Sequence, residues 1–521
     1  MGLFGAADAI GARGPPYSVR MLPPSVLRHA TLPLGLLLLA SPAGADVRLP
    51  ALFGDGMVLQ RDTQVAVWGW ADPGEEVRVV ASWSDPMRSA VAGPDGRWEL
   101  RLPTGEAGGP HTLAFLATNR IELEDVLFGE VWVCSGQSNM EWSIDRCAPM
   151  YTEAKAKMDH PRLRLFDVKR AFSTTPSEDC EGSWTACTPE SVAGFSAVAY
   201  FYGLELMNEL DVPVGLIGSN WGGTRCEAWT SAESIRRRGD FDDQLALAAR
   251  EAALPADSQE KRSFHYNHST ALFNGMIAPL LPYGIRGAIW YQGESNRGRA
   301  AQYHSLFPDM IADWRMHWGR GDFPFYFVQI APHGYENEKA HQPALLREAQ
   351  RLALRVPNTG MAVTMDIGDP ADIHPRNKHD VGKRLALWAL HGTYGRDVGS
   401  WSGPLFRSAS REGDALRVHF DHAEGGLLCE GEPTHLELAG ADGQWKPAVA
   451  RIDGETLLVR ADGCPEPVSV RYGWGNADMP GLKNAAGLPA SSFCSDPWPP
   501  TTGPSSPGPP GTLQRGKPTG P

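Results

Sequence analysis

Short apolar runs alternate with stretches of helical periodicity through the middle of the chain. The apolar runs predict strands at residues 131–134, 214–218, 287–291, 325–330 and 361–366. Apolar residues near the 3.6-residue period predict helices at residues 198–210, 302–318, 345–356 and 380–391. Strands that alternate with helices are typical of a parallel sheet with helices on both faces. The pattern therefore predicts an α/β domain over residues 126–400.

On both sides of this domain the pattern changes to the two-residue alternation of β-strands. Residues 65–70 and 76–80 alternate, and Asp95-Gly96 forms a hairpin turn before a further strand. Later strands are predicted at residues 415–420, 435–438, 448–452, 456–460 and 468–472. We therefore expect one β-sandwich domain at residues 46–125 and a second at residues 401–497. Residues 235–262 are polar and helix-prone, which indicates a surface excursion from the α/β domain.

The two ends of the chain are not expected to belong to these domains. Residues 32–39 are a short apolar run after Arg28, and Ala43-Gly-Ala45 is a small-x-small cleavage site, so residues 1–45 are predicted to be a signal peptide. Met21 is its more natural start. The run is too short to span a bilayer, so we expect an exported protein, periplasmic or extracellular, without stable membrane insertion after cleavage. An uncleaved N-terminal anchor is the alternative. Residues 498–521 are rich in Pro and Gly and are expected to be disordered.

Charge and composition narrow the choice of partners. The formal net charge is −13 and basic runs are absent from the sequence, which argues against a nucleic acid or an anionic membrane as partner. Seventeen tryptophans suit a carbohydrate partner, because indole rings pack on sugars, but tryptophan also fills β-rich cores.

The eight cysteines have no spacing typical of a zinc site, and we expect no metal and no cofactor. In an exported protein some of them could pair. Cys180 with Cys187 and Cys429 with Cys464 are the plausible pairs, whereas Cys134 is predicted to be a buried free thiol in a strand.

A serine follows the first predicted strand of the α/β domain. Gly136 ends that strand, and Ser138 lies at the turn into a helix. There its hydroxyl would sit at the carboxyl end of the sheet, where open α/β folds bind ligands, next to backbone N–H groups that stabilise an anion. The alternative is that Ser138 only caps the helix.

The next loops of the sheet also carry functional groups. Gly222 and Gly223 follow the second strand and let backbone N–H groups approach a ligand. Gln292 and Asn296 follow the third and could donate side-chain N–H groups to an oxyanion, and His374 follows the fifth. A parallel sheet brings these loops to one edge, which predicts a serine nucleophile, a histidine base and an oxyanion cradle. The alternatives are that the glycines form only a turn and that the histidine is structural.

The blocks in these loops resemble the sialate O-acetylesterase family, a carbohydrate-esterase branch of the SGNH hydrolases. They are Gly136-Gln-Ser-Asn-Met140, Trp221-Gly-Gly-Thr224, Trp290-Tyr-Gln-Gly-Glu-Ser-Asn296 and Asp372-Ile-His-Pro375. The resemblance implies a flavodoxin-like three-layer α/β domain flanked by the two β-sandwiches. It also implies that Ser138 is the nucleophile and His374 the base. The oxyanion donors would be the Ser138 N–H, the Gly222 or Gly223 N–H and a side chain of the third block.

The acid that orients the histidine is left open by the sequence. SGNH hydrolases usually carry Asp-x-x-His, but Ala371 stands three residues before His374 and Asp372 stands two before it. Residues two apart in an extended segment share a face, so Asp372 can lie near the imidazole. Glu294 of the third block is the rival candidate, although it can also be a buried structural carboxylate. A Ser–His dyad oriented by a backbone carbonyl is the third possibility.

The function expected from these motifs is removal of O-acetyl groups from acetylated carbohydrate, with sialic acid as the first substrate. Arg225, close to the second loop, could bind the sialic acid carboxylate, or it could form a salt bridge with Glu227. An acetylxylan or other plant-polysaccharide acetylesterase is the alternative enzyme. A non-catalytic, exported carbohydrate-binding protein is the alternative from another class.

Overall fold

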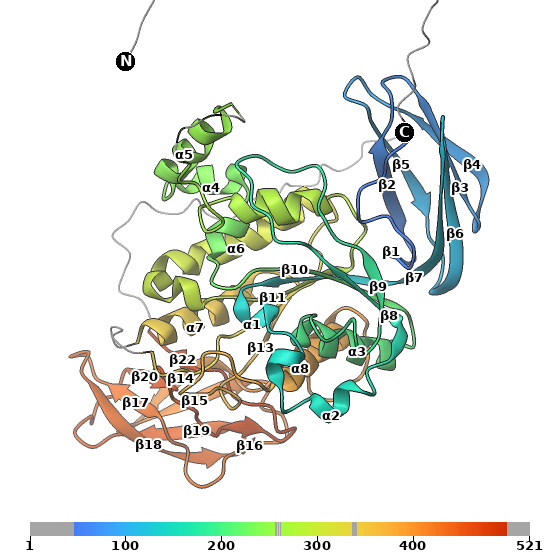
Figure 1. Cartoon of the computed structure of the whole chain (residues 1–521). Coiled ribbons are helices and arrows are strands. Elements are labelled where there is room, and N and C mark those ends of the chain that lie inside the picture. Colours follow the sequence, from blue (N-terminus) through green and yellow to red (C-terminus); the bar gives the residue numbers. More distant parts are fainter. Residues whose placement is uncertain (1–45, 256–257, 259, 261, 336–340, 497–521) are drawn as a thin grey trace, which may run out of the picture. The chain divides into compact units, whose positions relative to one another are not determined.

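The structure is a computed structural model that describes residues 46–255, 258, 260, 262–335 and 341–496 (Figure 1). The predicted signal peptide, its cleavage site and the Pro/Gly-rich tail lie outside the described residues. Within the described ranges, no helix combines the length and the apolar character needed to cross a bilayer.

Parallel strands form the centre of an 11-stranded sheet. The predicted strands are all present, and numbered along the chain they stand in the order 2-1-3-4-5, which is the flavodoxin-like order. They are β10 (Val214–Asn220), β7 (Arg120–Gly136), β11 (Gly287–Tyr291), β12 (Phe325–Val328) and β13 (Thr359–Ala362). Two strands that the sequence pattern did not indicate, β8 (His160–Asp167) and antiparallel β9 (Trp184–Cys187), extend the sheet beyond β10.

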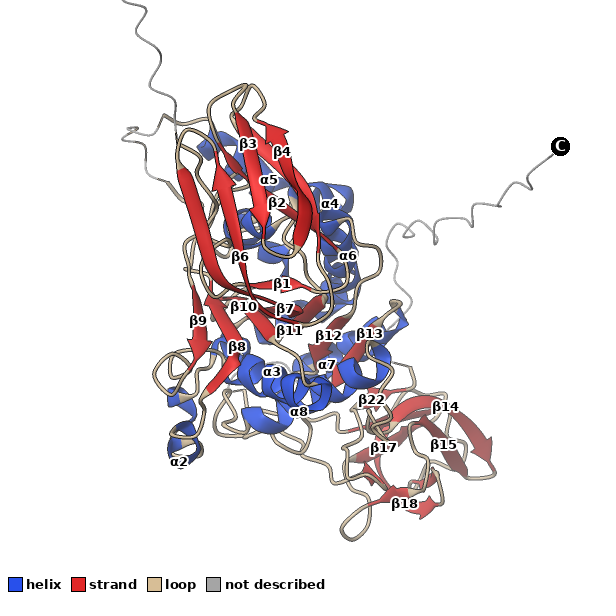
Figure 2. Ribbon diagram, turned by 90° about the vertical axis from the view of Figure 1, so that its right-hand side faces the viewer, coloured by secondary structure: helices blue, strands red, loops and turns tan. Residues whose placement is uncertain are grey.

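Helices cover both faces of this sheet, as predicted (Figure 2). Trp132 and Cys134 of β7 pack in one core with α3 (Ala197–Leu210) and α8 (Lys378–Gly392). Val131 and Val133 point to the opposite core, which contains α6 (Ala300–Trp318) and α7 (Gln342–Leu352). The strand is apolar on both faces because both faces are covered.

Strand β7 also belongs to the N-terminal β-structure. Its first half pairs antiparallel with β6 (Gly108–Leu116), and its second half pairs parallel with β10 and β11. The domain boundary expected near residue 125 therefore falls inside one continuous strand. The other strands of this region are β1 (Val58–Gln60), β2 (Gln64–Trp70), β3 (Glu76–Ala81), β4 (Ser84–Val91) and β5 (Arg97–Pro103), of which β2 and β5 pair apart from the main sheet.

The C-terminal β domain has its own antiparallel seven-stranded sheet and apolar core. The side chain of Arg347 on α7 is buried against it and donates to Gly473 O (3.0 Å) and Gly475 O (2.8 Å). The strands are β14 (Leu405–Glu412), β15 (Ala415–Asp421), β17 (Leu436–Ala439), β18 (Trp445–Asp453), β19 (Thr456–Arg460), β20 (Ser469–Tyr472) and β22 (Phe493–Cys494), with β16 (Leu427–Leu428) and β21 (Lys483–Asn484) pairing separately.

Short helices complete the described chain. The polar excursion contains α4 (Ala232–Arg238) and α5 (Asp242–Ala252), as its composition indicated. The others are α1 (Ser138–Glu141), η1 (Asp145–Cys147), α2 (Thr152–Lys155), η2 (Cys226–Trp229), η3 (Phe273–Ile277), η4 (Ala278–Leu280), η5 (Glu294–Arg299) and η6 (Ala353–Arg355).

The two proposed cysteine pairs do not form, because all eight cysteines are free thiols. The Cys187 thiol points into the core, where it donates to Met158 O at 3.6 Å. Cys429 lies beside Gly481 and Cys464 beside Gly440, so these two thiols face different turns of the C-terminal domain. The prediction of a buried free thiol at Cys134 is confirmed.

A buried carboxylate lies where the two halves of β7 meet. Glu130 is fully buried and accepts hydrogen bonds from Arg61 Nε (2.6 Å) and Arg286 Nε (2.7 Å). It also accepts from Gln60 Nε2 (3.1 Å) and the Tyr394 hydroxyl (3.1 Å). Burial opposes ionisation, but the arginines outweigh it, so the pKa of Glu130 is held below its ordinary value.

Glu130→Ala should lower the free energy of unfolding by about 3–5 kcal/mol, because it leaves two partly buried guanidinium groups without their carboxylate. The pKa of Glu130 is lowered in the folded state. Its contribution to the free energy of unfolding is therefore present above the ordinary carboxyl pKa and is lost as the pH falls through the folded-state pKa. Urea unfolding at several pH values measures both effects. Glu122→Ala, on the exposed face of β7 beside Arg120, is the control and should cost less than about 1 kcal/mol. Equal losses in the two variants would contradict the prediction.

Candidate active site

The turn between β7 and α1 places Ser138. Gly136 has φ +138°, and a Cβ built there would lie 2.2 Å from Tyr291 O, so only glycine fits. The Gln137 N–H donates to the same carbonyl (2.9 Å), which fixes the turn to β11. Gln137, not Ser138, is the N-cap residue of α1, and no side chain caps this helix. The Ser138 hydroxyl is therefore not used as a helix cap.

The structure brings Ser138 and His374 together. Ser138 Oγ and His374 Nε2 are 2.9 Å apart, although 236 positions separate the two residues in the chain. The indole of Trp142 stacks on the imidazole, with ring centroids 4.1 Å apart and planes 11° apart. This stacking holds the imidazole plane with Nε2 directed at the serine.

Of the two carboxylates considered for the histidine, Asp372 is the one beside the imidazole. Its Oδ1 lies 3.7 Å from His374 Nδ1, which is an ion-pair distance and too long for a hydrogen bond. The same oxygen accepts the His374 backbone N–H at 2.9 Å. Glu294 instead accepts a hydrogen bond from Asn139 Nδ2 at 2.6 Å, and its side chain is buried.

One of the two adjacent glycines lies against the serine. A Cβ built on Gly222 would be 3.3 Å from Ser138 Cβ and 3.6 Å from its Cα, which places Gly222 next to Ser138. The Gly222 N–H donates to Glu141 Oε2 at 2.6 Å, and Arg170 pairs with the other oxygen of Glu141. Gly223, with φ +74°, shapes the loop, and its carbonyl accepts from Asn267 Nδ2 at 2.9 Å.

The amides of Gln292 and Asn296 connect the second and third loops. Gln292 Nε2 donates to Thr224 O (3.1 Å) and to Asn296 Oδ1 (2.7 Å), which uses both of its hydrogens. Asn296 Nδ2 donates to Glu227 Oε2 at 2.9 Å. Both side chains are buried. In this structure they therefore brace the loop that carries Gly222 and do not offer these N–H groups to an oxyanion.

The surroundings of His374 favour the neutral imidazole. Burial lowers the pKa of His374, the positive charges of Lys378 and Arg146 lower it further, and Asp372 acts in the opposite direction. The imidazole is therefore unprotonated near neutral pH and can accept a proton from the Ser138 hydroxyl.

The suggested salt bridge between Arg225 and Glu227 does not form. The Glu227 carboxylate is fully buried and accepts hydrogen bonds from Arg299 Nη2 (2.6 Å) and Asn296. Arg225 is exposed, and no acidic side chain in the described part of the chain pairs with it. Burial lowers the pKa of the neighbouring His265, and the charges of His268 and Arg225 lower it further.

Several contacts around Ser138 involve residues that the sequence analysis did not select. Trp142 follows the serine by four residues, which is one helical turn, so the spacing could have indicated that its side chain lies near that of Ser138. Glu141 belongs to the same short segment. Asn139 stands in the first motif block, but no role was given to it. Lys378 gave no signal, because nothing in a sequence shows that a lysine at a helix start will be buried.

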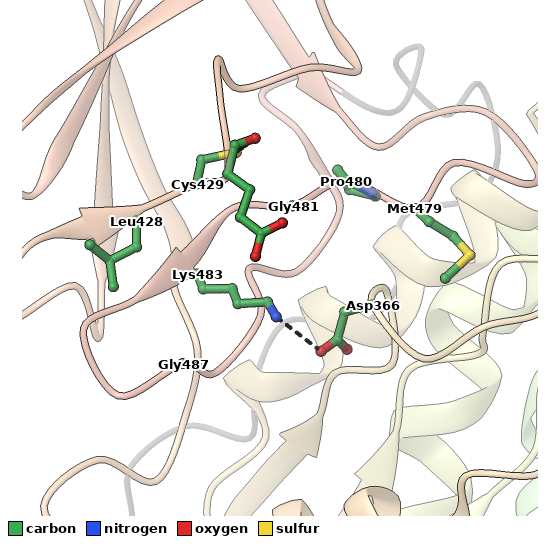
Figure 3. A pocket seen from close by; sticks show the side chains of 9 residues that line it. Asp366, Leu428, Cys429, Met479, Pro480, Gly481, Lys483 and Gly487 are labelled. Carbon is green, nitrogen blue, oxygen red and sulfur yellow. Dashed lines mark hydrogen bonds and ion pairs between the residues drawn. The ribbon is translucent and has the colours of Figure 1, made fainter.

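A cavity of about 430 Å³ lies away from these residues, between the C-terminal domain and the chain after β13 (Figure 3). Asp366 and Lys483 form an ion pair across it at 4.0 Å. Asp366 is also held by both terminal nitrogens of Arg384, at 2.7 and 2.8 Å. The residues that line this cavity do not include Ser138 or His374, so it is not the candidate active site.

A family model described as carbohydrate esterase, sialic acid-specific acetylesterase, matches residues 129–391. The chain belongs to this family. The sialate O-acetylesterase of Homo sapiens is 32% identical over 497 residues, which cover 87% of this chain and 92% of that protein. The sialate O-acetylesterase of Rattus norvegicus is 30% identical over 508 residues, covering 85% and 93%.

A crystal structure of a carbohydrate acetylesterase from Xanthomonas citri is similar over most of the chain. It is 38% identical with a TM-score of 0.78, and the alignment covers 87% of this chain and all of the other. This similarity supports the SGNH-type core. As a member of the acetylesterase family the chain is an ester hydrolase, and the matched segment contains Ser138, both glycines, the third block and His374.

The pKa of His374 should lie below its ordinary value of about 6.5, and Asp372→Asn should lower it further, because the carboxylate is the group that favours the imidazolium. NMR titration of the ring protons measures this, with the signal assigned by His374→Asn. Asp397→Asn, a change at an exposed position, is the control and should leave the titration unchanged. An unchanged pKa in Asp372→Asn would show that Asp372 does not act on the imidazole.

Proposed function

We propose that this acetylesterase removes acetyl groups from O-acetylated sialic acid, with Ser138 as nucleophile and His374 as general base. The observation that carries the proposal is the 2.9 Å contact between Ser138 Oγ and His374 Nε2 inside the segment that matches the family. The relatives that match most of the chain are sialate O-acetylesterases.

The proposed reaction proceeds in two halves. Ser138 Oγ attacks the acetyl carbonyl carbon while His374 Nε2 takes the hydroxyl proton, which gives a tetrahedral intermediate. The imidazolium returns this proton to the sugar oxygen as the C–O bond breaks, leaving an acetyl-serine. Water, deprotonated by His374, then attacks the acetyl-serine. The proton returns to Ser138 Oγ as acetate leaves.

The negative charge on the intermediate is stabilised by backbone N–H groups. We assign this role to the Ser138 N–H at the start of α1 and to the Gly222 N–H. Gly222 donates to Glu141 Oε2 in the free enzyme, so the oxyanion would take over that hydrogen bond. Asp372 lies where its charge orients the imidazole and favours the transient imidazolium.

Two features of the second loop suit an acidic sugar. Trp221 stacks on Tyr266 with centroids 4.6 Å apart, and Phe172 lies 6.5 Å from Trp221, so aromatic rings border the second loop. Such rings pack on the apolar faces of sugars. Arg225 is exposed in the same loop and can form a bidentate pair with the sialic acid carboxylate.

Acetylated xylan remains the second candidate substrate, because the same chemistry would act on a neutral polysaccharide and Arg225 would then have no role. The third possibility, a non-catalytic carbohydrate-binding protein, is disfavoured by the family and by the contact between Ser138 and His374.

The apolar run at residues 32–39 and the small residues Ala43-Gly-Ala45 support a further proposal, that the enzyme is exported. N-terminal sequencing of the secreted or periplasmic protein tests it. A mature N-terminus near Asp46 is expected.

Ser138→Ala should lower kcat for acetate release from O-acetylated sialic acid by about 10³- to 10⁶-fold, because the attacking oxygen is lost. The measurement compares release from this substrate with release from acetylated xylan. Ser408→Ala, at an exposed position of β14, is the control. Turnover at the wild-type rate in Ser138→Ala would refute the nucleophile assignment, and release mainly from xylan would move the proposal to the second substrate.

Arg225→Ala should raise KM for O-acetylated sialic acid by about 10- to 100-fold, because a charged hydrogen bond contributes about 1.5–3 kcal/mol. KM for a neutral acetylated sugar should not change. Arg236→Ala, which removes an exposed arginine of α4, is the matched control. Equal effects on both substrates would show that Arg225 does not recognise the carboxylate.

A further inference from the structure

A buried lysine lies close to the residues that react in the proposed mechanism. Lys378 is the first residue of α8, four positions after His374, and only 1% of it is exposed. Its Nζ donates to Asn139 Oδ1 at 2.5 Å, and Asn139 directly follows Ser138. No carboxylate of the described residues lies within ion-pair distance of this ammonium group. The ammonium group also lies 5.3 Å from the centroid of the Tyr291 ring. A buried cation held by a neutral amide and one ring is still costly, which makes a functional reason worth seeking.

The Asn139 amide connects three loops of the active site. Its Nδ2 donates to Glu294 Oε1 (2.6 Å) in the third loop and to Ile373 O (3.0 Å), next to His374. An ammonium group can only donate, whereas a carboxylate and a carbonyl only accept, so the amide has one satisfactory orientation. Lys378 selects it, because a flipped amide would direct its N–H groups at the ammonium and its oxygen at two acceptors.

We propose that Lys378 is a positioning residue for the reaction: through the Asn139 amide it holds the Ser138 turn against the segment that carries His374. This inference rests on the proposed roles of Ser138 and His374. Without the ammonium group the amide oxygen loses its donor, and the link between the two segments weakens. A displacement of about 1 Å between reacting groups can cost about 10²-fold in rate.

The charge of Lys378 has a second, separable effect. The titratable groups that face His374 are Asp372 on its own segment, Lys378 on α8, Arg146 on η1 and His333 after β12. Lys378, Arg146 and His333 disfavour the imidazolium, and Asp372 favours it. Removing the charge of Lys378 therefore raises the pH at which the imidazole becomes protonated.

Lys378 itself is charged at neutral pH. Burial lowers its pKa to about 8, and Cys147, Glu294 and Asp372 act in the opposite direction. Glu294 has one oxygen on Asn139, and its other oxygen has no hydrogen-bond partner among the described residues. Asn139 thus lies between a buried carboxylate and a buried ammonium group and contacts both.

Two variants of the full chain separate the hydrogen bond from the charge. Lys378→Met removes both and should lower kcat by about 10- to 100-fold with KM nearly unchanged. Lys378→Gln keeps a donor for Asn139 Oδ1 and should recover most of kcat. In both variants the acidic limb of the pH profile of kcat/KM should move to higher pH. Lys383→Met, which changes an exposed lysine of the same helix, should match the wild type.

Folding is checked by near-UV circular dichroism, and kcat is expressed per folded enzyme. A folded Lys378→Met with the kcat of Lys383→Met would overturn the proposal, and so would a folded Lys378→Gln that loses kcat while it keeps the donor to Asn139 Oδ1. The second outcome decides the question if Lys378→Met does not fold. Ser138→Ala distinguishes a failure of the proposed function from a failure of the positioning role. If it keeps turnover, the proposed function itself fails. If it loses turnover while the Lys378 variants match the control, only the positioning role fails.

Discussion

The pairing of β7 with β10 on one side and β11 on the other is the constraint on which the rest of the structure depends. The strand is in register with both neighbours up to Gly136, so the turn that follows is set against the loops that leave them. Tyr291 O at the end of β11 accepts from Gln137, and Gly136 O accepts from Trp221 after β10. Because backbone hydrogen bonds position Ser138, its place does not depend on the packing of a long helix.

Hydrogen bonds of buried polar side chains connect the active-site loops to one another. Gln137 Oε1 accepts from the backbone N–H groups of Gly293 and Ser295. The side-chain amides of Gln292 and Asn296 bond to the second loop. The Asn139 amide donates to Glu294 in the third loop and to Ile373 in the loop that carries His374. Buried polar groups are costly unless they are hydrogen-bonded, so these hydrogen bonds favour one arrangement over its alternatives, although Gln292 Oε1 and Glu294 Oε2 have no partner among the described residues. The loops have little regular structure of their own, and this network gives them the rigidity that a reacting pair requires.

The same groups explain why the third block looked like an oxyanion site in the sequence. Gln292 and Asn296 are the right residue types at the right sheet edge, and an amide N–H suits an anion as well as a carbonyl. The choice between these partners depends on distances of a few ångströms between loops that are far apart in the chain. The structure directs both amides to Thr224, Glu227 and each other. Only the three-dimensional arrangement shows that they brace the loop of Gly222.

Periodicity and turn chemistry alone predicted most of the regular elements of this protein, but not β8 and β9. Apolar runs with helical stretches between them predicted the parallel sheet and its helices, and the same edge argument placed Ser138 and His374 in one site, because chemically distinct loops at strand ends converge in any parallel sheet. What the tertiary structure decided is which side chains meet there. Trp142 stacked on the imidazole and Lys378 buried under Asn139 are contacts between distant segments, and β7 runs without a break across the expected domain boundary. A linear pattern records the polarity of each residue, but it carries no information on the burial and the partner that the fold assigns to it.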